Sequence, residues 1–289
     1  MTGKILRSTL SSARQKVLVW LDQLGWVPSG KTTYLGHPFV YPLDSLIGRK
    51  IASGKQWDAN LTVIIPAMLP DDEPEICEVG SNIGASLLQI LKVRPHARAI
   101  AIEPSQRFLP FLQRNLQLAG IDRVEVLPLL VGRSKGTVRL YNNASSASVG
   151  QERPELKARR KQAVTMTTLD EVYRQRPRVD FIKVDTDGFD LEVLRGAEET
   201  LKRDAPVLYF ELFPALVSTS TPEADLEWLQ GIGYSRFACF TPPGKLLGVT
   251  DKVEQALISR FPVPIRSALP PSLSVTTTVT AVLKAWEFR

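Results

Sequence analysis

Cysteine and histidine are scarce in this sequence of 289 residues, which has two of each. Cys77 lies within an apolar run and Cys239 is far from it along the chain, so the pair predicts neither a disulfide framework nor a zinc cluster. We interpret His37 and His96 as structural or solvated side chains. So few cysteines suit a reducing compartment, and we expect a cytoplasmic protein.

Long apolar runs are also absent. A membrane-spanning helix needs about 18 consecutive apolar residues, and the best candidate, residues 61–69, contains Pro66. The charge is not one-sided, because 36 basic residues are interspersed with 30 acidic ones, giving a net charge of +6. This balance is a weak indicator of an acidic partner, and a nucleic-acid substrate is not expected. A hydrophobic content of 44% predicts a packed globular core.

The first 20 residues lack acidic side chains but contain Lys4, Arg7, Arg14 and Lys16. Leucine and valine recur along residues 6–24 at a spacing that suits an amphipathic helix. We expect this helix to pack on the body of the protein or on a second copy in a homo-oligomer. A targeting or interfacial role is the alternative.

From residue 75 onward, short apolar runs alternate with stretches of helical periodicity. This alternation is typical of an α/β fold, in which helices cover both faces of a mostly parallel sheet. The predicted strands span residues 76–79, 99–102, 124–130, 181–184 and 207–210. One helix is predicted at residues 85–94 and another through Phe108, Leu112 and Leu116, which Gly120 would end in a left-handed conformation.

Two parts of the chain break this alternation. Residues 133–162 are predicted to hold a short strand at 136–141, a serine-rich loop at 142–150 and a basic, solvated stretch at 153–161. A lid or substrate-contacting insertion is the functional alternative for them. Residues 221–289 are predicted to add a helix at 224–229 and an edge strand at 275–282. We therefore divide the chain into an N-terminal extension, residues 1–74, and a main domain, residues 75–289.

A strand that ends in a tight glycine turn is predicted at residues 75–84, Glu-Ile-Cys-Glu-Val-Gly-Ser-Asn-Ile-Gly. The glycines allow a ligand to approach the backbone closely. The Gly-x-Gly-x-x-Gly pattern that holds a pyrophosphate at a helix N-terminus is absent here. Glu78, just before the turn, would repel a pyrophosphate but suits the ammonium group of a cofactor that carries an amino acid.

A second acid, Glu103, is expected at the end of the next strand, in the Ile-Glu-Pro-Ser sequence of residues 102–105. A carboxylate in this position can accept hydrogen bonds from both hydroxyls of a ribose. Two acids around a glycine turn therefore favour S-adenosylmethionine, a nucleoside with a positively charged amino acid, over NAD.

Further acids follow the fourth and fifth predicted strands. Asp185 is expected at the carboxyl end of the fourth strand, where open α/β sheets bind ligands, and Glu211 ends the fifth. Asp187 and Asp190 follow in the turn, where capping of the next helix is the alternative. Lys183 is two residues before Asp185 on the same strand, so their side chains point to the same face. Lys183 can therefore pair with an acid or belong to the site. Such carboxylates can act as a general base; without histidine they are a weak metal signature, and no metal site is predicted.

These segments together resemble the FkbM-type methyltransferases over about residues 36–240. The similarity lies in residues 78–84, Ile-Glu-Pro at 102–104, Thr-Leu-Asp-Glu at 168–171, residues 181–197 and Val-Leu-Tyr-Phe-Glu at 207–211. The resemblance implies a class I methyltransferase (Rossmann-like) fold with a seven-stranded sheet. It also implies S-adenosylmethionine as the methyl donor and a hydroxyl acceptor, often on a sugar or natural product. Asp187 departs from the family, which more often has glutamate there.

The resemblance further implies which residues meet the ligands. The donor would contact Glu78, Gly80, Ser81, Asn82, Gly84, Glu103, Pro104 and Ser105. Residues 183–188 would lie at the reacting end, so Lys183, Asp185, Asp187 and Glu211 are assigned to catalysis. We expect Asp185 or Glu211 to be the base of an O-methyl transfer, or the pair to hold a divalent cation. The alternatives are a nicotinamide oxidoreductase, which the glycine pattern disfavours, and a non-catalytic module that binds the donor.

Overall fold

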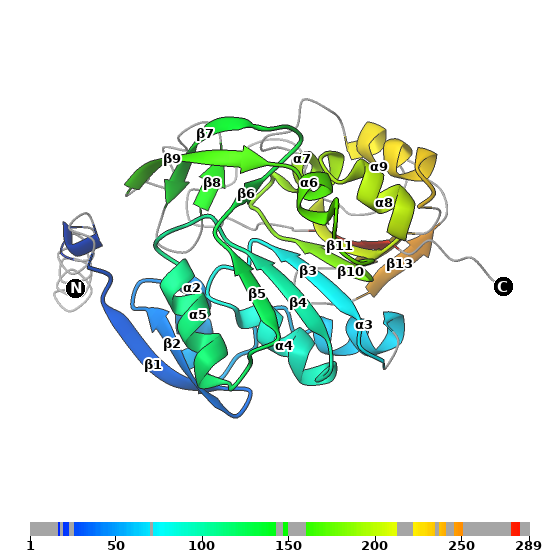
Figure 1. Cartoon of the computed structure of the whole chain (residues 1–289). Helices are drawn as coiled ribbons and strands as arrows, with labels where there is room; N and C mark the ends of the chain where they lie inside the picture. The colour runs from blue at the N-terminus through cyan, green and yellow to red at the C-terminus, as the bar shows by residue number, and fades with distance from the viewer. Residues whose placement is uncertain are drawn as a thin grey trace, which may run out of the picture.

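Figure 1 shows the computed structural model of the chain. The structure describes residues 17, 20–22, 26–69, 72–142, 147–149, 160–212, 222–234, 237–240, 246–250 and 279–283. Residues 153–159 of the predicted basic stretch and most of the N-terminal amphipathic helix lie outside the described residues, whereas residues 160 and 161 belong to a strand. Within the described part of the chain, no helix combines the length and apolar character needed to cross a bilayer.

A sheet of eight strands runs through the described residues, in the order β13-β12-β14-β11-β10-β3-β4-β5; its strands β3, β4 and β5 lie side by side in Figure 1. The strands from β11 to β5 are parallel to their neighbours, whereas β14 runs antiparallel to both β11 and β12. The bounds are β3 (Glu75–Val79), β4 (Arg98–Ile102), β5 (Val124–Leu127), β10 (Phe181–Val184), β11 (Val207–Leu212), β12 (Phe237–Phe240), β13 (Leu246–Thr250) and β14 (Val279–Leu283). The predicted α/β fold with a mostly parallel sheet is confirmed, with eight strands rather than seven.

Two layers of helices cover this sheet. Successive side chains of a strand point to opposite faces, so the apolar strands present apolar side chains on both faces, and each face is covered by helices. In β3, Ile76 belongs to the core beneath α2 to α5, and Cys77 to the core beneath α6 to α9. The helices are α2 (Leu46–Ala52), α3 (Leu61–Met68), α4 (Ala85–Val93), α5 (Leu109–Leu118), α6 (Leu169–Tyr173), α7 (Asp190–Arg195), α8 (Glu198–Asp204) and α9 (Pro222–Gly231). Gly120 has a φ of 68° after α5, which confirms the predicted left-handed residue.

The segment before β3 packs on the same face of the sheet as α4 and α5. The strands β1 (Ser29–Tyr34) and β2 (His37–Pro42) form a hairpin, and its turn residues Leu35 and Gly36 both have positive φ, as a two-residue hairpin turn of type I′ requires. Asn115 of α5 donates a hydrogen bond to the Val40 carbonyl and accepts one from the Val40 N–H. Residues 29–69 therefore share one hydrophobic core with the sheet.

A second sheet, with the order β6-β9-β7-β8, is inserted after β5. Its strands are β6 (Leu130–Val131), β7 (Gly136–Asn142), β8 (Ala147–Val149) and β9 (Arg160–Thr167). The strand predicted at 136–141 is confirmed, but two predictions are wrong. The single strand predicted at 124–130 breaks at Pro128, which has no N–H to donate, and continues in the other sheet. Part of the predicted serine-rich loop forms β8, because it pairs with β7.

The predicted edge strand near the C-terminus is wrong in its position. Residues 279–283 form β14, which lies inside the sheet between β11 and β12; Leu283, for example, is paired with Leu208 and with Phe237. An alternation of β-branched residues predicts a strand but contains no information about its partners, which are set by long-range pairing. The helix predicted at 224–229 is confirmed as α9.

Candidate functional site

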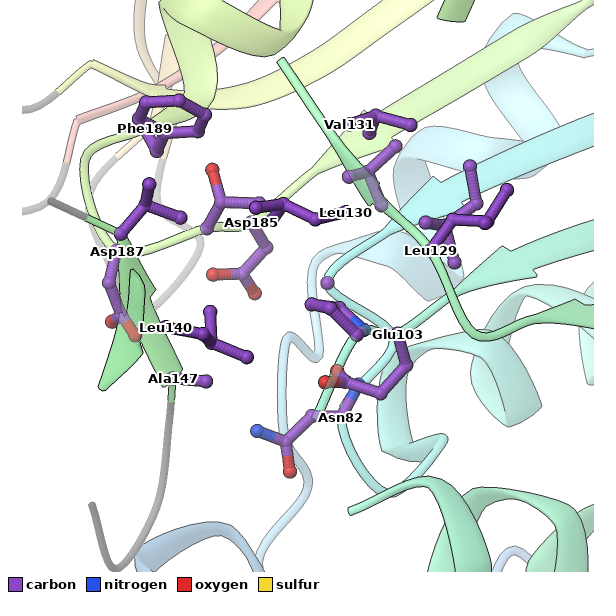
Figure 2. A pocket seen from close by; sticks show the side chains of 16 residues that line it. Asn82, Glu103, Leu129, Leu130, Val131, Leu140, Ala147, Asp185, Asp187 and Phe189 are labelled. Atoms are coloured by element: carbon purple, nitrogen blue, oxygen red, sulfur yellow. The ribbon is translucent and has the colours of Figure 1, made fainter. Parts of the chain in front are cut away.

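A pocket of about 500 Å³, partly open to solvent, lies at the carboxyl ends of β3, β4 and β10. In Figure 2, Asp185 and Glu103 point into it from the strand ends, and Leu140 and Ala147 of the inserted sheet form part of its wall. Its lining comprises Val79, Gly80, Asn82, Ile102, Glu103, Pro104, Leu129, Leu130, Val131, Leu140, Ala147, Val149, Asp185, Thr186, Asp187 and Phe189. The pocket therefore lies where open α/β sheets bind ligands.

The glycine turn forms the floor of this pocket beside β10. Gly80 has a φ of 82°, and a Cβ atom placed on it would lie 2.0 Å from the carbonyl oxygen of Asp185. The turn is tied to β4 by hydrogen bonds from the N–H groups of Gly80 and Ser81 to the Ile102 carbonyl. Gly84, with a φ of 84°, is the N-cap residue of α4. A glycine at position 80 is thus required by both its backbone angle and the space available.

Glu103 is held in a fixed orientation at the end of β4. One carboxylate oxygen accepts a hydrogen bond of 2.8 Å from the Asn82 N–H, and the other accepts one of 2.8 Å from the Ser105 N–H. Burial raises the pKa of Glu103 to about 7, although these hydrogen bonds oppose the shift. Each carboxylate oxygen can accept a further hydrogen bond, so Glu103 can receive hydroxyl groups from the pocket.

A cluster of charged side chains lies beside the pocket, centred on the buried Lys183. Its ammonium nitrogen Nζ is 2.9 Å from Oδ2 of Asp185, 3.6 Å from Oδ2 of Asp58 and 3.7 Å from Oε1 of Glu78. Burial alone would lower the pKa of Lys183, but the three carboxylates raise it well above its usual value. The lysine is therefore charged at neutral pH, and the predicted ion pair with an acid is present.

Glu78 lies behind the glycine turn, where it is fully buried. It accepts a hydrogen bond of 2.6 Å from the Ser86 hydroxyl of α4. Its other oxygen, Oε2, has no hydrogen-bond partner among the described residues. Burial raises the pKa of Glu78, and Lys183 opposes the shift. Glu78 thus contributes negative charge from below the pocket without lining it.

Asp190 connects the ends of β10 and β11. Its carboxylate accepts hydrogen bonds from the N–H and the hydroxyl of Thr186 and from the N–H of Glu211, so it joins the two strand ends rather than capping α7. Burial raises the pKa of Asp190 to about 7. Burial and the neighbouring carboxylates, Asp185 foremost, raise the pKa of Glu211 well above its ordinary value. Glu211 is therefore protonated at neutral pH.

The structure separates the predicted site residues into two groups. Those that line the pocket are Gly80, Asn82, Glu103, Pro104, Asp185 and Asp187; those that support it or lie beside it are Glu78, Ser81, Gly84, Ser105, Lys183 and Glu211. No pattern in the sequence points to Phe189. A contact with the site was only the alternative for residues 133–162, and Ala147 and Val149 of this segment, interpreted as loop, line the pocket together with Leu140. Sequence reasoning also missed Asp58, whose sequence context gives no signal of its contact with Lys183.

The described residues contain no candidate metal site, since no three of their His, Cys, Asp or Glu side chains are arranged to hold an ion. His37 and His96 are both exposed. In the cluster of Asp58, Glu78 and Asp185, the Lys183 ammonium lies between the carboxylates, in the position that a metal ion would need.

In the strand order, β14 lies between β11 and β12 and runs antiparallel to both, and the pocket lies at the glycine turn. Together these features define a class I methyltransferase fold. The chain belongs to the FkbM methyltransferase family, whose domain matches residues 78–235, more than half of the sequence.

Two curated relatives are named as methyltransferases. The methyltransferase sdnD of Sordaria araneosa is 31% identical over 165 residues, which cover 46% of this chain and 63% of that protein. Methyltransferase 1 of Beauveria bassiana (strain ARSEF 2860) is 27% identical over 154 residues, which cover 46% of this chain and 61% of that protein. The chain thus spans less than two thirds of the length of these relatives.

Solved structures with some similarity include two methyltransferases. The methyltransferase FkbM of Methylobacillus flagellatus KT is 20% identical, with a TM-score of 0.40 over 57% of this chain and 38% of that one. An S-adenosylmethionine-dependent O-methyltransferase of Thermotoga maritima is 13% identical, with a TM-score of 0.43 over 87% of this chain and 75% of that one.

Proposed function

We propose that this protein transfers a methyl group from S-adenosylmethionine to a hydroxyl oxygen of a sugar or another small molecule. The observation that carries the proposal is the position of Asp185. Its carboxylate lies in the pocket beside the glycine turn, at the carboxyl end of β10, and is 28% exposed. A base is needed there, because an alcohol becomes a good nucleophile only as its proton leaves.

The pocket has features that fit the donor. Gly80 leaves a space that any side chain would fill, and Glu103 is fixed with acceptor capacity that suits the two hydroxyls of a ribose. The negative charge of the cluster around Lys183 suits a cationic ligand. Gly80, Asn82, Glu103 and Pro104 would hold the donor, which supplies a methyl group already activated on a sulfonium.

The chain's own residues would then align the acceptor and remove its proton. The acceptor oxygen forms a bond to the methyl carbon as the bond from that carbon to sulfur breaks, and the hydroxyl proton passes to Asp185. The product S-adenosylhomocysteine leaves with the sulfur electron pair. The raised pKa of Glu211 favours Asp185 as the base, because a Glu211 that is already protonated has no carboxylate to take up the hydroxyl proton. Lys183, 2.9 Å from Asp185, keeps the aspartate oriented.

The test is the Asp185→Asn variant, compared with wild type and with Asp122→Asn. Asp122 is exposed on the loop between α5 and β5, at the opposite edge of the sheet. Formation of S-adenosylhomocysteine is measured with panels of sugar and polyketide acceptors, and its binding by calorimetry. We expect Asp185→Asn to lose nearly all turnover and to keep product affinity within a few fold, while Asp122→Asn behaves as wild type. Normal turnover by Asp185→Asn would remove this residue from the mechanism.

The same assays separate the alternative functions. A nicotinamide oxidoreductase would not bind S-adenosylhomocysteine, and the family of the chain speaks against it. A non-catalytic module would bind the compound without turnover in any acceptor panel. Failure of the wild-type protein to bind S-adenosylhomocysteine would overturn the donor half of the proposal.

A further inference from the structure

Asp58 comes from the segment before the methyltransferase sheet, in the loop between α2 and α3. Its φ of 47° places a non-glycine residue in the left-handed region. Such a conformation costs energy and is found most often at functional sites or turns. The loop directs the carboxylate of Asp58 toward Lys183, so the two charges are 3.6 Å apart.

The cluster around Lys183 presents carboxylate, not ammonium, to its surroundings. The side chain of Lys183 is 1% exposed, whereas that of Asp58 is 22% exposed and that of Asp185 is 28% exposed. Of these groups Asp185 lines the pocket, so a ligand there meets a carboxylate of the cluster and not its ammonium. This favours a cationic group.

Charge in the cluster is also incompletely balanced by the protein. Among the described residues, Lys183 is the ammonium within 4 Å of all three carboxylates, and Lys50 acts on Asp58 as a further, weaker positive charge. Oε2 of the buried Glu78 has no hydrogen-bond partner among the described residues. Buried carboxylates without a full set of partners are costly. A second positive charge bound next to the cluster would offset this cost.

Among the three carboxylates, Asp58 is the one best placed to receive that charge. Glu78 is fully buried, and Asp185 already accepts a hydrogen bond of 2.9 Å from Lys183. The described residues donate no hydrogen bond to the carboxylate of Asp58, which is 3.6 Å from the same ammonium.

We propose that Asp58 is a donor-site residue whose carboxylate receives the ammonium group of the methionine part of S-adenosylmethionine. This inference rests on the proposed function and assigns to Asp58 the contact that the sequence suggested for Glu78. Asp58 does not line the pocket, but it shares the Lys183 ammonium with Asp185, which does. The methionine end of the donor would therefore extend past Asp185 toward the N-terminal segment, which makes residues 29–69 part of the binding site.

Calorimetry with two ligands tests the assignment. S-adenosylhomocysteine has the ammonium group, whereas 5′-methylthioadenosine has the nucleoside and thioether without the amino acid. The variant is Asp58→Asn, because asparagine tolerates a positive φ and removes only the charge; Asp122→Asn is the matched control. A partly exposed, charge-assisted hydrogen bond predicts about a tenfold loss of S-adenosylhomocysteine affinity in Asp58→Asn. Binding of 5′-methylthioadenosine should stay within about twofold of wild type.

Equal losses for both ligands would show a structural role for Asp58 and overturn the assignment, as would unchanged affinity for both. If wild type binds S-adenosylhomocysteine and Asp58→Asn binds it equally well, the assignment fails while the proposed function stands. If wild type does not bind it, the proposed function fails and the assignment with it. Thermal unfolding of each variant, followed by circular dichroism, confirms that the comparison is made between folded proteins.

Discussion

The contact between the glycine turn and β10 can be tested with Gly80→Ala. The new Cβ would lie 2.0 Å from the carbonyl oxygen of Asp185 and 2.9 Å from its carbonyl carbon, both backbone atoms. Neither can move without shifting β10 or the turn. The left-handed φ of 82° costs a non-glycine residue about 1–2 kcal/mol, and overpacking adds about 1–3 kcal/mol. We therefore expect the free energy of unfolding, measured with urea, to fall by about 2–5 kcal/mol.

Ligand binding should suffer as well, because the displaced carbonyl belongs to Asp185. A displacement of about 1 Å in a binding site can cost a hundredfold, so we expect at least a tenfold loss of affinity for S-adenosylhomocysteine. The control is Gly54→Ala, at a φ of 81° with no atom within 4 Å of the added Cβ. It isolates the backbone cost. If both variants lose the same stability, β10 and the turn are not in the close contact described above.

Two further predictions concern charged groups. Lys183→Met would leave three carboxylates without their shared cation, so we expect the free energy of unfolding to fall by about 3–5 kcal/mol at pH 8. Part of this stability should return at pH 5.5, where the carboxylates bind protons more readily. Urea unfolding at both pH values tests this, and wild-type stability of the variant at pH 8 would contradict it. Because the pKa of Glu103 is raised to about 7 and ribose hydroxyls donate best to its ionised form, affinity for S-adenosylhomocysteine should be constant only well above pH 7 and fall progressively as the pH decreases through 7 and below. Glu103→Gln should bind more weakly with a flatter pH profile, and calorimetry that gives parallel profiles would refute this role.

The central strands could be predicted from the sequence because their physical requirements are local. The strands β3, β4 and β10 are covered on both faces, so they appear as short runs of apolar residues. The end of a helix could likewise be predicted where a single residue determines it, as Gly120, with its positive φ, does after α5. The site at the carboxyl edge followed from the same pattern, since the positions of Glu103 and Asp185 depend on where β4 and β10 end.

Contacts between distant segments could not be predicted in this way. β8 is recognisable as a strand through its pairing with β7, and the position of β14 depends on β11 and β12 together. Asp58 shows the same limit at the site. Neither its own loop nor the residues around Lys183 contain a pattern that indicates their contact, which arises from the packing of α3 on the sheet.

The cluster around Lys183 also links donor binding to folding. Burial raises the pKa of Glu78 and of Asp58, so the ligand-free protein reduces its excess negative charge by holding protons more tightly. A cation beside Asp58 would favour the ionised carboxylates, release those protons and stabilise the folded chain in proportion to its binding. The three carboxylates come from the N-terminal segment, from β3 and from the end of β10. One ligand charge would therefore hold together three segments that are remote in sequence, and residues 29–69 would become more resistant to unfolding when the donor is bound.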